Sequence, residues 1–90
     1  MQQQTPNDPY ALALSALAAT LSDERRAQRF LDLTGIETGE LRARAADPGL
    51  LTALIAFLEA HEPDLLAVCE DIGVKAEQLV AVRRQIEGGA

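Results

Sequence analysis

The chain has 90 residues, a formal net charge of −6 and a hydrophobic fraction of 48%, which alanine and leucine mainly supply. This length allows one domain with a single core and excludes separate catalytic and binding lobes. Alanine and leucine are strong helix formers, and no stretch alternates apolar and polar residues long enough for a strand. We therefore predict an all-α fold, a compact bundle of five to six short helices forming one domain over residues 8–87.

The acidic charge lies mainly in the second half of the chain. Residues 45–90 hold eight acidic residues against three basic ones, whereas residues 23–44 hold five of each. Nucleic acid and anionic membranes repel an acidic chain unless its basic groups converge on one face. The apolar stretches are far shorter than the roughly 20 residues of a membrane span. With a single cysteine, Cys69, and no apolar leader segment, we expect a cytoplasmic protein without internal disulfides.

The first predicted helix follows a polar segment, residues 1–7, that we expect to be a disordered tail. Asp8 and Pro9 form a typical helix start, with Asp8 as N-cap and Pro9 at the first helical position. Four apolar residues then follow at helical spacing: Tyr10, Leu14, Leu17 and Leu21. We predict that this stripe is buried against the core.

Glycine stops separate the helices that follow. We predict that Ser22 caps the second helix and that Gly35 ends it in the left-handed conformation that glycine adopts at low cost. Thr38 is predicted to cap a short third helix. The fourth helix starts at Asp47–Pro48 and is apolar nearly all round, so we expect it at the centre of the fold.

The fifth helix is predicted to start at Glu62–Pro63 and to end at Gly73, and the sixth to end before a flexible C-terminus, residues 88–90. The run Thr34–Gly35–Ile36 recurs as Ile72–Gly73–Val74 at an offset of 38 residues, and the Asp-Pro starts recur at an offset of 39. These offsets indicate two pseudo-repeated three-helix units. The alternative is that unrelated helices reuse the same end residues, because the physics of helix ends offers few choices.

Few residues suit catalysis or cofactor binding. His61 is the only histidine and Cys69 the only thiol. We predict that Cys69 is buried on the apolar stripe of the fifth helix, and that His61 bonds free carbonyls at a helix end. No spacing matches a zinc site, a calcium loop or a phosphate loop. We therefore expect no enzyme, no catalytic, cofactor-binding or metal-ligating residues and no small-molecule substrate; a thiol enzyme built on Cys69 is the less favoured alternative.

Five arginines on the second and third predicted helices form a candidate protein-interaction patch: Arg25, Arg26, Arg29, Arg42 and Arg44. In the competing interpretation, each arginine pairs with a nearby carboxylate. Arg29, for example, can reach Asp32 three residues further along a helix.

A DNA-binding helix-turn-helix protein is the alternative function. Its turn typically has a small residue, a glycine four residues later, an apolar residue next and a buried aliphatic residue six after the glycine. Four residues fit this pattern: Cys69, Gly73, Val74 and Leu79. The following helix offers four outward polar or basic residues: Lys75, Gln78, Arg83 and Arg84. Because Glu77 and Glu87 oppose them, we regard nucleic acid as the less favoured partner.

We favour a small protein-interaction or regulatory module whose partner is another protein or a second copy in a homodimer. Two three-helix units packed around the fourth helix leave room for a groove at their junction, and such grooves bind helices or peptides through apolar anchors. The apolar excess of the fourth and fifth helices equally suits a core or a homodimer, and the sequence does not separate these uses.

Four features of the chain carry a resemblance to a known family: Phe30–Leu31 leading to Thr34–Gly35, the segment Leu41–Arg42–Ala43–Arg44–Ala45, Asp47–Pro48, and Gly73 with its flanking hydrophobic residues. Between Pro9 and Arg84 the chain resembles a family of small alphaproteobacterial proteins classed only as a domain of unknown function. The resemblance implies a compact, all-helical cytoplasmic protein and brings no activity, cofactor or catalytic residue.

Overall fold

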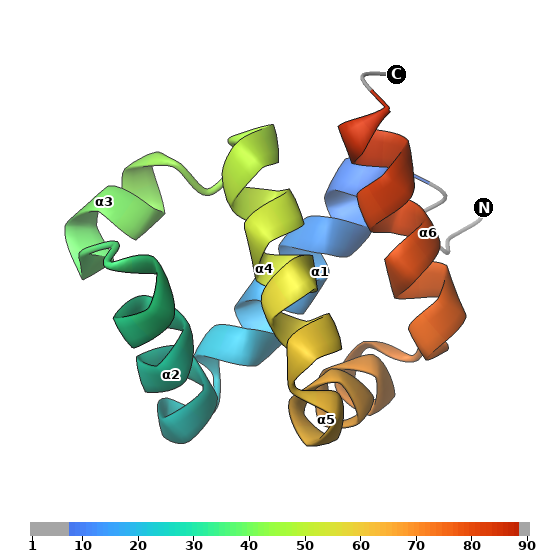
Figure 1. Cartoon of the computed structure of the whole chain (residues 1–90), viewed down its shortest axis with the longest axis horizontal. Helices are drawn as coiled ribbons and strands as arrows, with labels where there is room; N and C mark the ends of the chain where they lie inside the picture. The colour runs from blue at the N-terminus through green and yellow to red at the C-terminus, as the bar shows by residue number, and fades with distance from the viewer. Residues whose placement is uncertain (1–7, 89–90) are drawn as a thin grey trace, which may run out of the picture.

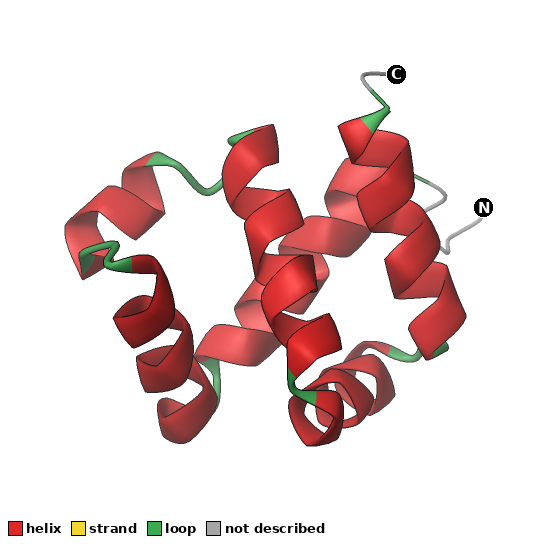
Figure 2. Ribbon diagram, in the orientation of Figure 1, coloured by secondary structure: helices red, strands yellow, loops and turns green. Residues whose placement is uncertain are grey.

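The computed structural model describes residues 8–88, and its regular elements are α-helices (Figure 2). They are α1 (Pro9–Leu21), α2 (Glu24–Thr34), α3 (Thr38–Ala43), α4 (Pro48–Ala60), α5 (Glu62–Ile72) and α6 (Ala76–Glu87). No strand occurs within this range, so the prediction of an all-α bundle is confirmed, with six helices. The predicted tail, residues 1–7, and residues 89–90 of the predicted flexible end lie outside the described residues. Of the six helices, none is long and apolar enough to cross a membrane.

Helices α1 and α4 pack against each other at the middle of the molecule, with α1 behind α4 in Figure 1. α6 packs against both of them, and α5 packs beneath them against α1, α4 and α6. α2 and α3 lie on the other side of α4 from α6 (Figure 1). α4 therefore contacts several helices, as its apolar character predicted. The radius of gyration of 12.3 Å is close to the value of about 12 Å for a compact chain of this length.

The core extends from α1, α4 and α6 to α2 through an aromatic contact. Phe30 of α2 and Phe57 of α4 meet edge to face, with ring centroids 5.5 Å apart and ring planes at 62°. This geometry adds electrostatic attraction to the burial of both rings. α3 contributes Leu41, which is buried, and otherwise lies at the periphery.

The N-terminal ends of the helices follow local side-chain chemistry. The Asp8 and Asp47 carboxylates accept hydrogen bonds from backbone N–H groups in the first turns of α1 and α4, as predicted. The prediction that Ser22 caps α2 is wrong: its hydroxyl donates to a carbonyl at the end of α1, and Asp23 caps α2. The prediction that Thr38 caps α3 is also wrong, because Thr38 is already the first residue of α3.

Gly35 and Gly73 end α2 and α5 in the left-handed conformation, with φ of 71° and 75°. Both predicted stops are confirmed, and the order of a 13-residue helix, an 11-residue helix and a glycine stop occurs twice. The third helices differ, since α3 has 6 residues and α6 has 12. The repeat therefore holds for the order of elements, while only α6 packs into the centre of the fold.

The predicted buried stripe of α1 is largely on the surface. Of its four residues only Leu17 is buried, whereas Tyr10, Leu14 and Leu21 are each more than a third exposed. The face that packs inward instead carries small residues, including Ala13 and Ala16, which are fully buried. Small side chains allow neighbouring helices to approach closely, so this face is the one that α4, α5 and α6 contact.

Candidate interaction surface

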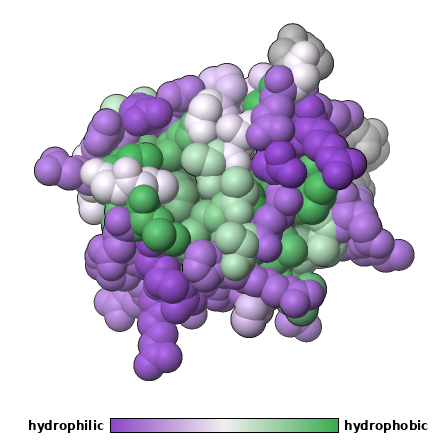
Figure 3. Space-filling view, viewed as in Figure 1, coloured by the Kyte–Doolittle hydropathy of each residue, from purple (hydrophilic) through white to green (hydrophobic). Residues whose placement is uncertain are grey.

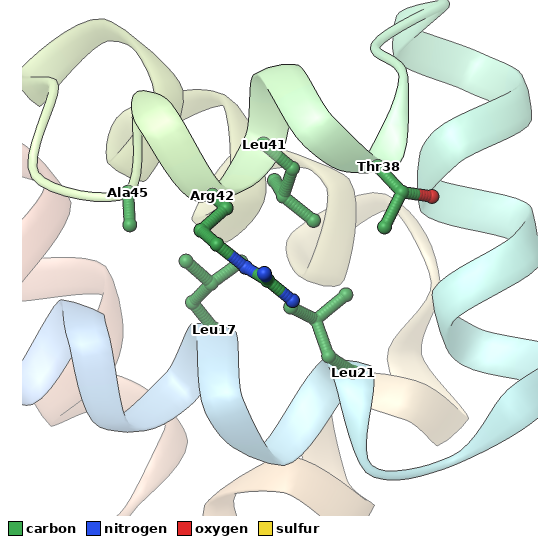
Figure 4. Close-up of a pocket in the computed structure, with 6 residues that line it drawn as sticks. All are labelled: Leu17, Leu21, Thr38, Leu41, Arg42 and Ala45. Carbon is green, nitrogen blue, oxygen red and sulfur yellow. The ribbon is translucent and has the colours of Figure 1, made fainter.

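α3 lies over the C-terminal half of α1 and leaves an apolar hollow of about 220 Å³ between the two helices. Leu17 and Leu21 point from α1 toward α3, and Leu41 points back from α3 (Figure 4). Small-molecule pockets usually measure about 300–1,000 Å³, so this hollow is nearer the size of one or two side chains. We name the α1–α3 surface for seven residues around it: Tyr10, Leu14, Leu17, Leu21, Leu41, Arg42 and Ala45.

Beyond the hollow, the apolar stripe continues along α1 toward its N-terminus. Tyr10 is 36% exposed and Leu14 is 38% exposed. None of the 13 residues of α1 is charged, although charged residues make up 24% of the whole chain. Solvent-facing positions of a helix normally carry polar or charged side chains. A contiguous row of large apolar side chains in their place is typical of a binding surface.

The second three-helix unit provides an internal comparison for this row. At the offset of 39 residues, the stripe positions of α1 correspond to four residues of α4: Gly49, Ala53, Ala56 and Ala60. All four are exposed, and the surface over α4 appears as pale green, weakly apolar area in Figure 3. The three outward positions of α1 therefore carry tyrosine and leucine where α4 carries glycine and alanine, whereas the fourth, Leu17, belongs to the core.

Arg42 adds a positive charge to the apolar surface. Its side chain extends from α3 along the hollow toward Leu21 (Figure 4). Arg42 is exposed, and no carboxylate of the described residues lies within 4.0 Å of its guanidinium. Its charge is therefore available to an acidic group on a partner.

Two other arginines of the predicted patch connect α2 to α5. Arg26 contacts the Asp71 carboxylate at 3.3 Å, and Arg29 contacts Asp64 at 2.7 Å with two donor nitrogens. The interpretation in which Arg29 pairs with the nearby Asp32 is therefore wrong, because its partner is Asp64 of α5. The side chain of Asp64 is 12% exposed, so this ion pair is shielded from water on one side. Both arginines thus lie in ion pairs between helices, and neither guanidinium is free.

The remaining arginines of the predicted patch have different surroundings. Arg44 contacts Asp47 at 2.9 Å and Glu40 at 3.5 Å. The hydrogen bond from Arg44 lowers the pKa of the Asp47 carboxyl and raises the pKa of Arg44 itself. Arg25 is exposed and has no ion pair with the described residues. Three of the five arginines thus lie in ion pairs, and a binding role for the set stays a prediction.

A family comparison covers nearly the whole chain. The family described as "Protein of unknown function (DUF3572)" matches residues 6–89. The chain belongs to this family. The resemblance to a family of unknown function, seen in the sequence between Pro9 and Arg84, is thereby confirmed. Comparison with curated proteins and with solved structures found no match.

In this DUF3572 protein, the two side chains that a thiol enzyme would use, Cys69 and His61, are engaged in packing and in a helix-end hydrogen bond. Cys69 is 4% exposed, and burial raises the pKa of its thiol. His61 links α4 to α5, with its Nδ1 2.9 Å from the carbonyl oxygen of Phe57 and its ring 4.7 Å from the Phe57 ring. The predictions that Cys69 is buried and that His61 bonds a carbonyl at a helix end are confirmed.

In the DUF3572 chain, the residues of the predicted helix-turn-helix pattern have the expected backbone conformation and burial, but the following helix has fewer free basic groups than expected. Gly73 is left-handed and Leu79 is fully buried, as the turn pattern requires. Arg83, however, was expected to face outward as a free basic group. Its guanidinium instead forms ion pairs with Glu59 and with Glu87, the latter at 2.8 Å. α6 therefore offers less free positive charge than its sequence indicated.

At the junction of the two three-helix units, the structure has a hollow lined largely by charged and polar residues rather than the predicted groove with apolar anchors. It measures about 470 Å³ and lies where α2 meets the α4–α5 connection. Its lining includes the bonded pair Arg29–Asp64 and the carbonyl-bound His61. The apolar hollow between α1 and α3 lies inside the first unit, and another, of about 620 Å³, lies along α6 in the second unit. The sequence predicted the α1 stripe but placed it in the core, because no charged residue of α1 marks its outer face.

Proposed function

We propose that this protein is a small helical interaction module that binds another polypeptide through the α1–α3 surface. The observation that carries the proposal is the row of large apolar side chains at exposed positions of an uncharged helix. Tyrosine anchors supply much of the binding energy of protein interfaces, and leucine adds buried apolar area. The comparison with α4 supports a binding role, because the same outward positions there carry only glycine and alanine.

The hollow and Arg42 define the chemistry of the partner. The hollow accepts one or two apolar side chains, and Arg42 offers its guanidinium to a carboxylate beside them. An amphipathic helix with leucine or aromatic anchors and an acidic residue at its edge has this arrangement. The Arg42 pair would mainly fix orientation and register, while apolar burial supplies the affinity.

We also propose that the protein is cytoplasmic and that it is not an enzyme. A free cysteine suits a reducing compartment. The Cys69 thiol is 4% exposed and burial raises its pKa, which disfavours the reactive thiolate, and the ring of His61 is bonded to the Phe57 carbonyl. DNA binding has less support than protein binding, because Arg26, Arg29, Arg44 and Arg83 are all held by carboxylates.

Site-specific photo-crosslinking in native cells tests the proposed surface. A photoreactive amino acid replaces Leu14 in one variant and Ala53 in a matched variant, because the two positions are equivalent in the two units and both are exposed. We expect covalent protein adducts from position 14 and none, or far fewer, from position 53. Equal labelling from both positions, or no adduct from position 14, would contradict the proposal.

A second comparison uses the chain's own repeat as a template. Replacing Leu14 and Leu21 by alanine gives these two exposed positions of α1 the residues of their α4 counterparts, Ala53 and Ala60. We expect this double variant to keep its helical circular dichroism and to lose the adducts formed by a photoreactive residue at Ala45. Retained labelling would show that the stripe does not contribute to binding.

A further inference from the structure

The two ends of the α1–α3 surface have complementary shapes and charges. The N-terminal end presents the projecting side chains of Tyr10 and Leu14, with the exposed Asp8 carboxylate beside them. The C-terminal end presents the hollow under α3 and the guanidinium of Arg42, which has no ion pair among residues 8–88. Projecting apolar groups with a negative charge would therefore fit a hollow with a positive charge on a second copy of the same surface.

The spacing of the stripe residues along α1 allows each of two copies to place its projecting end against the hollow of the other at the same time. The stripe residues Tyr10, Leu14, Leu17 and Leu21 are separated by four, three and four residues, an order that reads the same in both directions. It is the alternating four–three spacing of a coiled-coil seam. In an antiparallel pair of such helices, Tyr10 faces Leu21 of the other helix, and Leu14 faces the edge of Leu17, which is 5% exposed. The three exposed stripe residues, Tyr10, Leu14 and Leu21, then each have an apolar partner.

We propose that the occupant of the α1–α3 surface is a second copy of this chain, in a dimer whose α1 helices pair antiparallel about a two-fold axis. Resting on the function proposed above, this inference identifies the partner. The interface is isologous, since the same patch serves both copies. The projecting Tyr10 and Leu14 of one copy contact the hollow between α1 and α3 of the other. The axis passes between Leu14 and Leu17.

Charge complementarity supports this arrangement. With Tyr10 opposite Leu21, the Asp8 carboxylate of one copy comes close to the end of the hollow toward which Arg42 of the other copy points. The nearest carboxylate in sequence to that end is Asp23, which would repel Asp8. Asp23 is already engaged by the first-turn N–H groups of α2 and by Arg26 at 4.0 Å. Each copy thus supplies one acidic and one basic group, giving two ion pairs.

The other occupants fit less well. The only apolar side chains of residues 1–7 are Met1 and Pro6, so this segment lacks the leucine or aromatic anchors that the stripe requires. A 13-residue helix is about 20 Å long and its exposed stripe residues are 36–38% exposed, so the α1 pair buries less than the roughly 1,200 Å² of a standard-size specific interface. We therefore expect exchange between monomer and dimer, with a dissociation constant on the order of 10 μM.

Sedimentation velocity over a range of protein concentrations, combined with charge exchange, tests the dimer. Arg42→Glu alone and Asp8→Lys alone place like charges at both pairs, and we expect each to weaken the dimer by at least about tenfold. Mixing the two variants restores opposite charges at both pairs of the mixed dimer. The mixture should return to within about threefold of the wild-type dissociation constant.

Asp8 also caps α1, so folding is checked by circular dichroism, and Asp8→Ser keeps a capping group while removing the charge. If Asp8→Lys does not fold, the pair Asp8→Ser and Arg42→Gln replaces it, and their effects on the dissociation constant should be less than additive. Full additivity would overturn the ion pair.

Two results would overturn the dimer itself: a wild-type protein that stays monomeric at about 1 mM, a concentration far above the expected dissociation constant, or a dimer that survives Leu14→Lys together with Arg42→Glu. If the protein is monomeric but position 14 still crosslinks to a different protein, the second-copy inference fails and the proposed interaction function stands. If position 14 forms no adduct at all, both fail.

Discussion

Replacing the two left-handed glycines by alanine should destabilise the protein, whereas the same replacement at a helical glycine should not. Gly35 and Gly73 have φ of 71° and 75°, and a Cβ added at either meets no atom within 4 Å. The cost is therefore conformational rather than steric against neighbours. A left-handed L-residue costs roughly 1–2 kcal/mol, and removing the freedom of glycine in the unfolded chain returns about 0.4–1 kcal/mol. We expect each variant to lose about 1 kcal/mol.

Gly39 is the matched control, because it lies within α3 and a Cβ there also meets nothing within 4 Å. Gly39→Ala should raise the free energy of unfolding by about 0.5–1 kcal/mol, since alanine is the better helix former. Urea unfolding followed by circular dichroism, at one fixed protein concentration, measures all three variants. A loss of 1 kcal/mol corresponds to a fall of about 4–8 °C in Tm for a domain of this size. Gly73→Ala at or above wild-type stability would refute the assignment of these glycines as helix stops.

Three further predictions concern the thiol, the core and acid stability. Alkylation of Cys69 by iodoacetamide at pH 8, followed by mass spectrometry, should be slower by several orders of magnitude in the folded state than in denaturant, because the thiol is buried and its pKa is raised; equal rates would contradict its burial. Leu54→Ala should cost about 2–5 kcal/mol in urea unfolding, whereas Leu14→Ala should cost only about 1–1.5 kcal/mol because Leu14 is 38% exposed; similar losses would place Leu14 in the core. The pKa of Asp47 is lowered from 3.8 by its hydrogen bond from Arg44, so its contribution to stability is complete above that pH and is lost as the pH falls through the lower folded value. Asp47→Ser keeps a capping hydroxyl without the charge, and should make the free energy of unfolding fall less steeply below about pH 4; an unchanged slope would contradict the Arg44 contribution.

The sequence predicted the helix ends better than the helix faces, because a helix end depends on groups within a few residues. Asp8, Asp47, Gly35 and Gly73 each perform the predicted role, through carboxylate-to-amide bonds or a left-handed backbone. Even the error at Ser22 is local: serine and aspartate are both good N-caps, and Asp23 stands one residue closer to the helix.

Ion pairs between helices depend on the tertiary arrangement and could not be predicted from the sequence. Arg29 and Asp64 are 35 residues apart, and Arg26 and Asp71 are 45 apart. Residues 23–44 hold equal numbers of acidic and basic residues, which suggested pairing within the segment. The carboxylates that pair with Arg26 and Arg29 of α2 lie instead in α5. From the sequence, the ion-pair partners of these arginines could be predicted only among residues close along the chain. In the fold, Arg26 and Arg29 pair with residues of another helix.

The buried face of α1 could not be chosen from periodicity, since α1 is apolar on both sides. The usual rule places large side chains inside, and here it fails because close packing against α4, α5 and α6 requires the small side chains of Ala13 and Ala16 on the inner face. That choice leaves tyrosine and leucine outward. α4 faces the same geometric problem with the opposite solution, with its leucines inward and its alanines outward. Two helices in equivalent places of one repeat thus both contribute to the core, and α1 in addition keeps large apolar side chains on its outer face.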